Sequence, residues 1–145
     1  MDVADTTPRR FRLPPPRVEV RHTGTARGMG VFALELFEPG AIVEVCPVLL
    51  FRENVEALPG SFSAQGVQRP RTYALALGYG SMYNSANPAN MSFRALRVTQ
   101  NPLIEFSAVR VVGMGEELTI NYSGFAGACE SPDDAWFARM GVEKL

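Results

Sequence analysis

Residues that bind metals or form disulfides are scarce in this chain. Its 145 residues include two cysteines, Cys46 and Cys129, which lie far apart in the sequence, and a single histidine, His22. Zinc sites and disulfide frameworks need several such residues at short, regular spacings. We therefore expect no metal site, and we expect both cysteines to be free thiols, buried or at the surface.

Long hydrophobic runs and strong net charge are missing as well. No apolar run approaches the roughly 20 residues of a membrane-spanning helix, and the acidic start Met-Asp-Val-Ala-Asp is unlike a signal peptide. The net charge of −1 provides no basic field of the kind that attracts nucleic acids. We expect an intracellular protein, in the cytoplasm or the nucleus, that neither enters a membrane nor binds nucleic acid directly.

The composition that is present suits one globular domain. A chain of 145 residues with 46% hydrophobic and 20% charged residues can bury a core of its own. Residues 1–16 contain four prolines among several arginines, which favours a flexible, extended arm; the arm could instead lie in a groove or guide an acidic partner. We assign the folded domain to residues 17–125 and a C-terminal closing segment to residues 126–145.

Short apolar stretches, interrupted by glycine, proline or asparagine roughly every ten residues, predict a mostly-β fold of several small sheets. Strands are expected over 17–21, 41–45, 48–51, 93–98, 103–112 and 115–122, with a hairpin joining 93–98 to 103–112. Residues 73–77 are expected to form a strand or a turn, and an apolar stretch at 31–33 follows a glycine-rich turn. Residues 52–70 are interpreted as an irregular insertion with a helical turn near 55–58, and residues 84–90 as a polar run outside regular structure. A short helix is expected at Ala135–Ala138.

The stretch from Gly115 to Tyr122 carries the clearest pattern. Leu118 and Ile120 alternate with polar residues after a glycine turn, which predicts a short half-buried strand that presents Tyr122 at its end. Taken alone, the pattern is better explained by a tyrosine that is half buried with its hydroxyl in water. Its meaning depends on the motifs that precede it.

Four features in order resemble the SET-domain protein lysine methyltransferases, in particular their short, stand-alone members. They are the turn Gly28-Met29-Gly30-Val31-Phe32, the turn Phe37 to Gly40, the run Asn84 to Asn90, and Gly-Glu-Glu-Leu-Thr-Ile-Asn-Tyr ending at Tyr122. A Gly-x-Gly turn is common, whereas the last motif at this distance after an Asn-rich loop is much more specific. The resemblance, from about Val18 to Tyr122, implies small β-sheets around a knot-like C-terminal threading, with short helical segments.

The resemblance also implies S-adenosylmethionine as cofactor and a protein lysine as methyl acceptor. By this resemblance the cofactor lies against Gly28, Met29 and Gly30, where glycine lets the backbone approach a ligand closely. Tyr83, Asn84 and Ser85 complete the implied cofactor site. Asn84 is expected to donate its side-chain amide toward the amino-acid end, and its neighbour to contact the adenine through backbone groups.

The Asn-rich loop departs from the family pattern Asn-His-Ser, two variable residues, then Pro-Asn. Ser85 stands at the histidine and Ala86 at the serine, although Asn84 and Asn90 mark the two asparagines at the usual separation. Lost side-chain hydrogen bonds predict weaker cofactor binding. Two alternatives therefore stay open: a non-catalytic SET-fold module that binds a protein partner, and an enzyme that methylates another acceptor. Asn87 and Asn90 are also explained by a purely structural loop.

In such an enzyme Tyr122 aligns the amine and the methyl group, because a phenol with a pKa near about 10 is a poor base at neutral pH. The resemblance places four residues along the lysine channel: Tyr79, Phe93, Ile120 and Trp136. Ile120 and Phe93 carry no hydroxyl, so products beyond monomethyl-lysine are a hypothesis; as an alternative, Ile120 is plain strand core. Trp136 with Phe137 either closes the channel or anchors a terminal helix.

Overall fold

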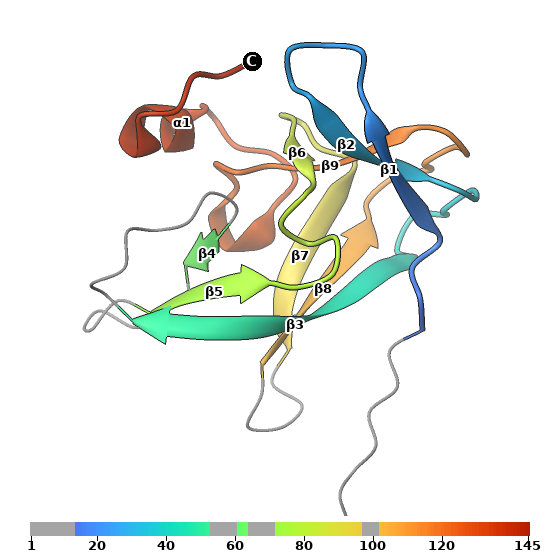
Figure 1. Cartoon of the computed structure of the whole chain (residues 1–145), viewed down its shortest axis with the longest axis horizontal. Coiled ribbons are helices and arrows are strands. Elements are labelled where there is room, and N and C mark those ends of the chain that lie inside the picture. Colours follow the sequence, from blue (N-terminus) through green and yellow to red (C-terminus); the bar gives the residue numbers. More distant parts are fainter. Residues whose placement is uncertain (1–13, 53–60, 64–71, 97–101) are drawn as a thin grey trace, which may run out of the picture.

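The computed structural model of the chain describes residues 14–52, 61–63, 72–96 and 102–145. Within these residues nine strands form two sheets (Figure 1), in the orders β1-β2-β9-β6 and β4-β5-β3-β8-β7. The expected mostly-β fold of small sheets is confirmed. The expectations for the N-terminal arm through residue 13, and for a helical turn at 55–58, lie outside the described residues.

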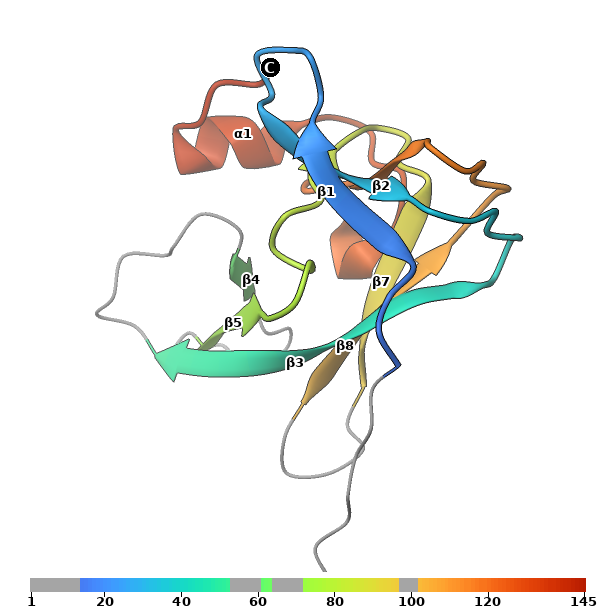
Figure 2. The same cartoon turned by 45° about the vertical axis from the view of Figure 1, so that its right-hand side comes forward.

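The elements follow one another along the chain in this order: β1 Val18–His22, β2 Met29–Ala33, β3 Ile42–Arg52, β4 Ser61–Ser63, β5 Thr72–Ala76, β6 Asn84–Ser85, β7 Met91–Leu96, β8 Leu103–Ala108, β9 Glu117–Ile120, the 3-10 turn η1 Phe125–Gly127, and α1 Ala135–Met140. Strands β1 and β2 lie in the upper part of the molecule and β3 runs along its lower part in both views (Figures 1 and 2). The predicted hairpin is confirmed as β7–β8, and the predicted terminal helix as α1.

Strand β3 corrects the prediction of two strands separated at Pro47. It pairs with β8 from Ile42 to Pro47 and with β5 from Val48 to Arg52. Proline lacks a backbone N–H and is tolerated where a ladder ends. Because Pro47 stands where β3 changes partner, the strand continues through it.

Residues 84–90 were expected outside regular structure, which is wrong for the first two. Asn84 and Ser85 form β6, which pairs in parallel with Thr119 and Ile120 of β9. Neither residue favours a strand by propensity, so the pairing is imposed by tertiary contact. The run thereby places its asparagines directly beside the strand that leads to Tyr122.

Two turns of the same kind lead into β3 and β9. The Ala41 N–H donates to the Glu38 carbonyl (2.9 Å) with Gly40 at φ 84°, and the Glu116 N–H donates to the Gly113 carbonyl (3.1 Å) with Gly115 at φ 83°. These are the positive φ values that a type II turn needs at its third residue. The expected turn at 37–40 is therefore confirmed, and a bridge between Phe37 and Val112 joins the two turns.

The core lies between and around the two sheets. Its largest fully buried side chains include Tyr83, Phe106, Met91, Leu118 and Ile120. Ile120 is 2% exposed, as the strand-core alternative expects. Cys46 is buried and Cys129 partly exposed, and both are free thiols, as predicted. No helix among the described residues is long and apolar enough to cross a membrane. Nor do three or more His, Cys, Asp or Glu side chains in these ranges gather to hold a metal ion.

Asn90 replaces a missing strand partner for β9. It is 3% exposed, its Nδ2 donates to the Glu117 carbonyl (2.7 Å), and its Oδ1 accepts the Thr119 N–H (2.8 Å). The Asn90 backbone N–H also donates to Thr119 Oγ1 (3.2 Å). One asparagine side chain thus satisfies a donor and an acceptor of β9 that would otherwise be buried without partners.

We expect Asn90→Ala to lower the free energy of unfolding by about 2 to 4 kcal/mol, because it leaves buried backbone groups unsatisfied. Asn87→Ala is the matched control: Asn87 also exchanges hydrogen bonds, with Ser131, but it is exposed to solvent. Its loss should stay below about 1 kcal/mol. Urea denaturation followed by circular dichroism measures both, and equal losses would contradict this role of Asn90.

Candidate active site

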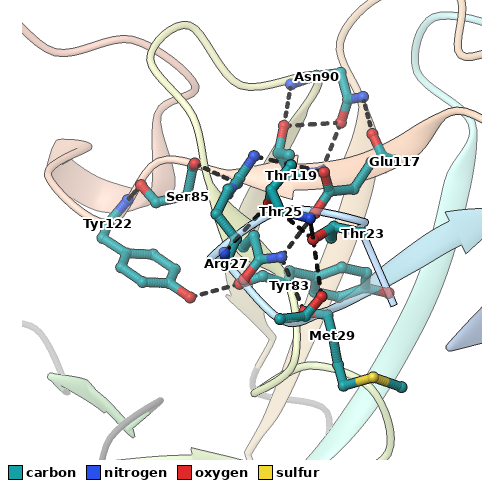
Figure 3. A network of polar contacts seen from close by, with 12 residues as sticks. Thr23, Thr25, Arg27, Met29, Tyr83, Ser85, Asn90, Glu117, Thr119 and Tyr122 are labelled. Carbon is teal, nitrogen blue, oxygen red and sulfur yellow. Dashed lines mark hydrogen bonds and ion pairs between the residues drawn. The ribbon is translucent and has the colours of Figure 1, made fainter. Parts of the chain in front are cut away.

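Tyr122 lies two residues beyond the end of β9 and is held from both its backbone and its side chain. Its backbone N–H donates to Ser85 Oγ (3.2 Å), and its hydroxyl donates to the Tyr83 carbonyl (2.6 Å), as Figure 3 shows. The phenol hydrogen is thereby committed to the protein. The lone pairs of the phenol oxygen are left to accept hydrogen bonds from a ligand.

The protonation of Tyr122 follows from its surroundings. Burial raises the pKa of its phenol, and the charge of Glu117 adds to this, whereas the Arg27 charge opposes it. The phenol is therefore neutral at neutral pH and is a hydrogen-bonding group rather than a base. This direction supports the alignment role expected for Tyr122.

Two aromatic side chains of α1 cover the Tyr122 ring. Trp136 meets it edge-on, with 4.8 Å between the ring centroids and 66° between the planes, and Phe137 stacks on it at 6.0 Å. The backbone N–H of Trp136 donates to Ser123 Oγ (3.2 Å). No residue of α1 is itself fully buried. These ring contacts are thus the chief packing of α1 against Tyr122, each of the kind that contributes about 0.5–1.5 kcal/mol.

Asn84 lies on β6 and bridges two elements of the same sheet. Its Nδ2 donates to the Met29 carbonyl of β2 (3.0 Å) and to Glu117 Oε1 of β9 (2.7 Å). Both amide hydrogens are therefore used within the protein, although the sequence predicted their donation to a cofactor. In the described residues no hydrogen bond reaches Asn84 Oδ1, so this oxygen is the atom left to bind a ligand.

The glycine turn has two different roles. A Cβ on Gly30 would lie 2.6 Å from Glu117 Oε1 and 3.2 Å from Asn84 Nδ2, so this glycine makes room for protein side chains. Gly28 has φ 75° and nothing within 4 Å of the Cβ position, so its backbone is open to approach. Met29 between them is 49% exposed.

Arg27 is a site residue that the sequence reasoning missed. Its Nη2 donates to the Ser85 carbonyl (2.8 Å), and its Nη1 lies 3.5 Å from Glu117 Oε2. The side chains of Arg27 and Glu117 are 27% and 19% exposed, so the pair is partly shielded from water. Only their positions in the sequence could have indicated this pair, because Arg27 directly precedes Gly28 and Glu117 lies within the motif that ends at Tyr122. Figure 3 shows the bond from Arg27 to Ser85, and the Arg27 charge acts on the Tyr122 phenol.

The remaining predicted residues are tied mainly to the core. Tyr79 and Phe93 are half buried and pack against the core cluster, and the Phe93 ring lies 5.8 Å from that of Phe106. Phe93 is also approached by the segment after Tyr122, since a Cβ on Gly127 would lie 1.9 Å from its carbonyl oxygen. The structure thus links Tyr122 directly to Tyr83, Ser85 and Trp136, and links Asn84 to Met29.

Comparisons with known proteins agree with this arrangement. The family model of the SET domain matches residues 28–123. A histone-lysine N-methyltransferase of Schizosaccharomyces pombe, H3 lysine-37 specific, is 31% identical over 127 residues, covering 83% of this chain and 76% of that protein. The residues matched by the family model contain the glycine turn, the Asn-rich loop and Tyr122.

Two solved structures share the fold. A histone methyltransferase candidate from Plasmodium falciparum superposes with a TM-score of 0.65 at 19% identity, over 77% of this chain and 97% of that one. Chaetomium thermophilum polycomb repressive complex 2, bound to S-adenosylmethionine, gives a TM-score of 0.61 at 21% identity, over 76% of this chain and 15% of that one. With the family model spanning the glycine turn through Tyr122, the chain belongs to the SET-domain family.

Proposed function

We propose that this SET-domain protein transfers methyl groups from S-adenosylmethionine to lysine side chains of a protein substrate. Family membership and the lysine methyltransferase of Schizosaccharomyces pombe support this activity. The observation that carries it is the placement of a neutral, half-buried Tyr122 phenol on the carbonyl of Tyr83, the residue that directly precedes Asn84. The non-catalytic alternative is not favoured.

The residues present fit the cofactor. The open backbone at Gly28 allows a ligand to approach, and Asn84 Oδ1 is an acceptor for its ammonium group. The Arg27 guanidinium offers positive charge for its carboxylate. Ser85, which replaces the family histidine, uses its hydroxyl to hold the Tyr122 backbone instead. We therefore assign cofactor binding to Arg27, Gly28, Met29, Asn84 and the backbone of Tyr83 and Ser85.

The protein supplies alignment and a dry environment. When bound, S-adenosylmethionine provides an electrophilic methyl group that the lysine nitrogen takes in an in-line displacement. The Tyr122 hydroxyl and the Tyr83 carbonyl place two oxygens 2.6 Å apart, where they can accept weak hydrogen bonds from a polarised methyl or from the amine. Trp136 and Phe137 shield this place from water, which lowers the pKa of a lysine ammonium and favours its neutral form.

The partners follow from the same proposal. The substrate is a protein that presents a lysine, and the lysine channel is assigned to Tyr79, Phe93, Ile120 and Trp136. We keep the expectations of a cytoplasmic or nuclear location and of no direct contact with nucleic acid or membrane. A screen of lysine-containing against lysine-free peptides tests the acceptor, since methylation of both alike would favour another acceptor group.

We expect products beyond monomethyl-lysine. Ile120 is buried in the core and Phe93 has no hydroxyl, so neither offers a group that would hold a water molecule against the amine. Mass spectrometry of a substrate peptide at exhaustion should show di- or trimethyl-lysine. A product that stops at one methyl group would contradict this expectation.

We expect Tyr122→Phe to lower kcat by at least about tenfold while the affinity for S-adenosylhomocysteine changes less than about twofold. The substitution removes the oxygen that aligns the reacting groups but retains the ring under Trp136. Steady-state kinetics and calorimetry measure the two quantities. Tyr73→Phe, which removes a phenol oxygen from β5, is the matched control and should leave kcat unchanged. Equal kcat in wild type and Tyr122→Phe would remove the proposed alignment role.

We expect Arg27→Gln to weaken S-adenosylhomocysteine binding by about tenfold, because it removes the charge that pairs with the ligand carboxylate. Binding of 5′-methylthioadenosine, which lacks that carboxylate, should change less than about twofold. Arg17→Gln is the control, since Arg17 pairs with Glu35 at the surface. Equal weakening of both ligands would contradict the carboxylate contact, and no binding of either ligand to wild type at millimolar concentration would contradict the enzyme itself.

A further inference from the structure

Tyr83 connects the candidate active site with the core. Its carbonyl accepts the Tyr122 hydroxyl, whereas its own side chain is 1% exposed and points away from Tyr122 (Figure 3). The Tyr83 ring packs on Phe106 at 4.9 Å. Whatever fixes this side chain also fixes the carbonyl on which Tyr122 depends.

The far end of the Tyr83 side chain is held by a buried carboxylate. Glu44 of β3 is 6% exposed, and its Oε2 accepts the Tyr83 hydroxyl at 2.6 Å. Burial and the Glu44 charge raise the pKa of Tyr83 well above its usual value, so this phenol stays protonated and donates. In the described residues Glu44 forms no ion pair. Burial of the Glu44 carboxylate is therefore unfavourable by itself, and the hydrogen bonds that it accepts offset this cost.

The second carboxylate oxygen holds the start of the same turn. Glu44 Oε1 accepts the Tyr79 N–H at 2.9 Å, and the Met82 N–H donates to the Tyr79 carbonyl at 2.8 Å. The turn closes tightly over this carboxylate: a Cβ on Gly78 would lie 2.5 Å from Glu44 Oε1, and one on Gly80 would lie 2.9 Å from Cys46 Sγ. Glu44 thus fixes both ends of the segment from Tyr79 to Tyr83.

We propose that Glu44 is a positioning residue for methyl transfer, which acts by fixing Tyr83 and hence the carbonyl that orients the Tyr122 hydroxyl. The inference rests on the proposed function. Glu44 lies in the five-stranded sheet, and Tyr83, whose hydroxyl donates to it, directly precedes β6 of the four-stranded sheet. Its hydrogen bonds therefore set the placement of the reacting site relative to the core. Small displacements of aligned groups are enough to lower rates severalfold or more.

Glu44→Gln is the sharpest substitution, because it preserves the size of the side chain. Two donors of the turn face Glu44, the Tyr79 N–H and the Tyr83 hydroxyl, and the Cys46 thiol also hydrogen-bonds to it. A glutamine can accept only one of the two turn donors and turns its NH2 toward the other. Ser81→Ala is the matched control: it removes a hydrogen bond of the same turn, from Ser81 Oγ to the Ala76 carbonyl (2.8 Å), that does not involve Tyr83.

We expect Glu44→Gln to lower kcat by about tenfold, with the substrate KM and the affinity for S-adenosylhomocysteine within about twofold of wild type. Rates are compared at a temperature where circular dichroism shows every variant to be folded. In a double-mutant cycle, Glu44→Gln should change kcat less than about twofold when Tyr122 is already phenylalanine, because its effect passes through the Tyr122 hydroxyl. Full additivity, or a loss in Ser81→Ala as large as in Glu44→Gln, would overturn the proposal.

A second readout does not depend on activity. In protein labelled with 13C at the tyrosine ζ carbon, the Tyr122 resonance is assigned by its loss in Tyr122→Phe. It should shift in Glu44→Gln and stay in place in Ser81→Ala. An unmoved Tyr122 resonance, or a moved one with unchanged kcat, overturns the positioning role. If Tyr122→Phe itself retains full kcat, the proposed mechanism fails, and the resonance still decides whether Glu44 positions Tyr122.

Discussion

The parallel pairing of β6 with β9 is the contact on which the site depends. It joins Asn84 to Thr119 and Ser85 to Ile120, and the Ala86 N–H extends it by donating to the Ile120 carbonyl at 3.0 Å. A ladder this short is weak by itself. Asn90 supports it by occupying the backbone groups of Glu117 and Thr119. The same few residues therefore hold β9 in register and bring the Asn-rich loop to Tyr122.

The altered loop motif has a structural explanation that differs from decay. A loop that had lost its role would be expected to leave polar side chains without partners. In the described part of the chain, no buried side-chain nitrogen or oxygen lacks a hydrogen bond. Ser85 holds the Tyr122 backbone, and its carbonyl receives Arg27. In this SET-domain lysine methyltransferase a serine stands at the position of the family's histidine, and its hydroxyl holds the backbone of Tyr122.

Local patterns were enough to predict the strand that leads to Tyr122, the turn at 37–40, the β7–β8 hairpin and the terminal helix. In each, hydrophobic alternation or turn chemistry agrees with the final contacts. They were not enough to predict β6, because Asn84 and Ser85 acquire strand geometry only from β9. Nor did they reveal that β3 passes through Pro47, which follows from a change of partner that only the assembled sheet defines.

The residues missed at the site share one property, which is that their partners are distant in sequence. Arg27 reaches Ser85 across 58 positions, and Glu44 reaches Tyr83 across 39. Sequence motifs indicate the groups that could contact a cofactor. They do not indicate the distant side chains that hold those groups in place. Tyr83 illustrates the difference. The resemblance assigned it to the cofactor site, whereas its side chain is buried on Phe106 and Glu44 and only its backbone faces Tyr122.

Tyr83 is also the point where the two sheets constrain each other. Its ring packs on β8 and its hydroxyl binds β3, both in the five-stranded sheet, while its backbone leads into β6 of the four-stranded sheet. Because Tyr83 contacts both sheets, the site cannot shift relative to the core without breaking the hydrogen bond from the Tyr83 hydroxyl to the buried Glu44 carboxylate. Because a buried charge without its donors is unfavourable, the Tyr122 hydroxyl keeps one position, which an in-line displacement requires.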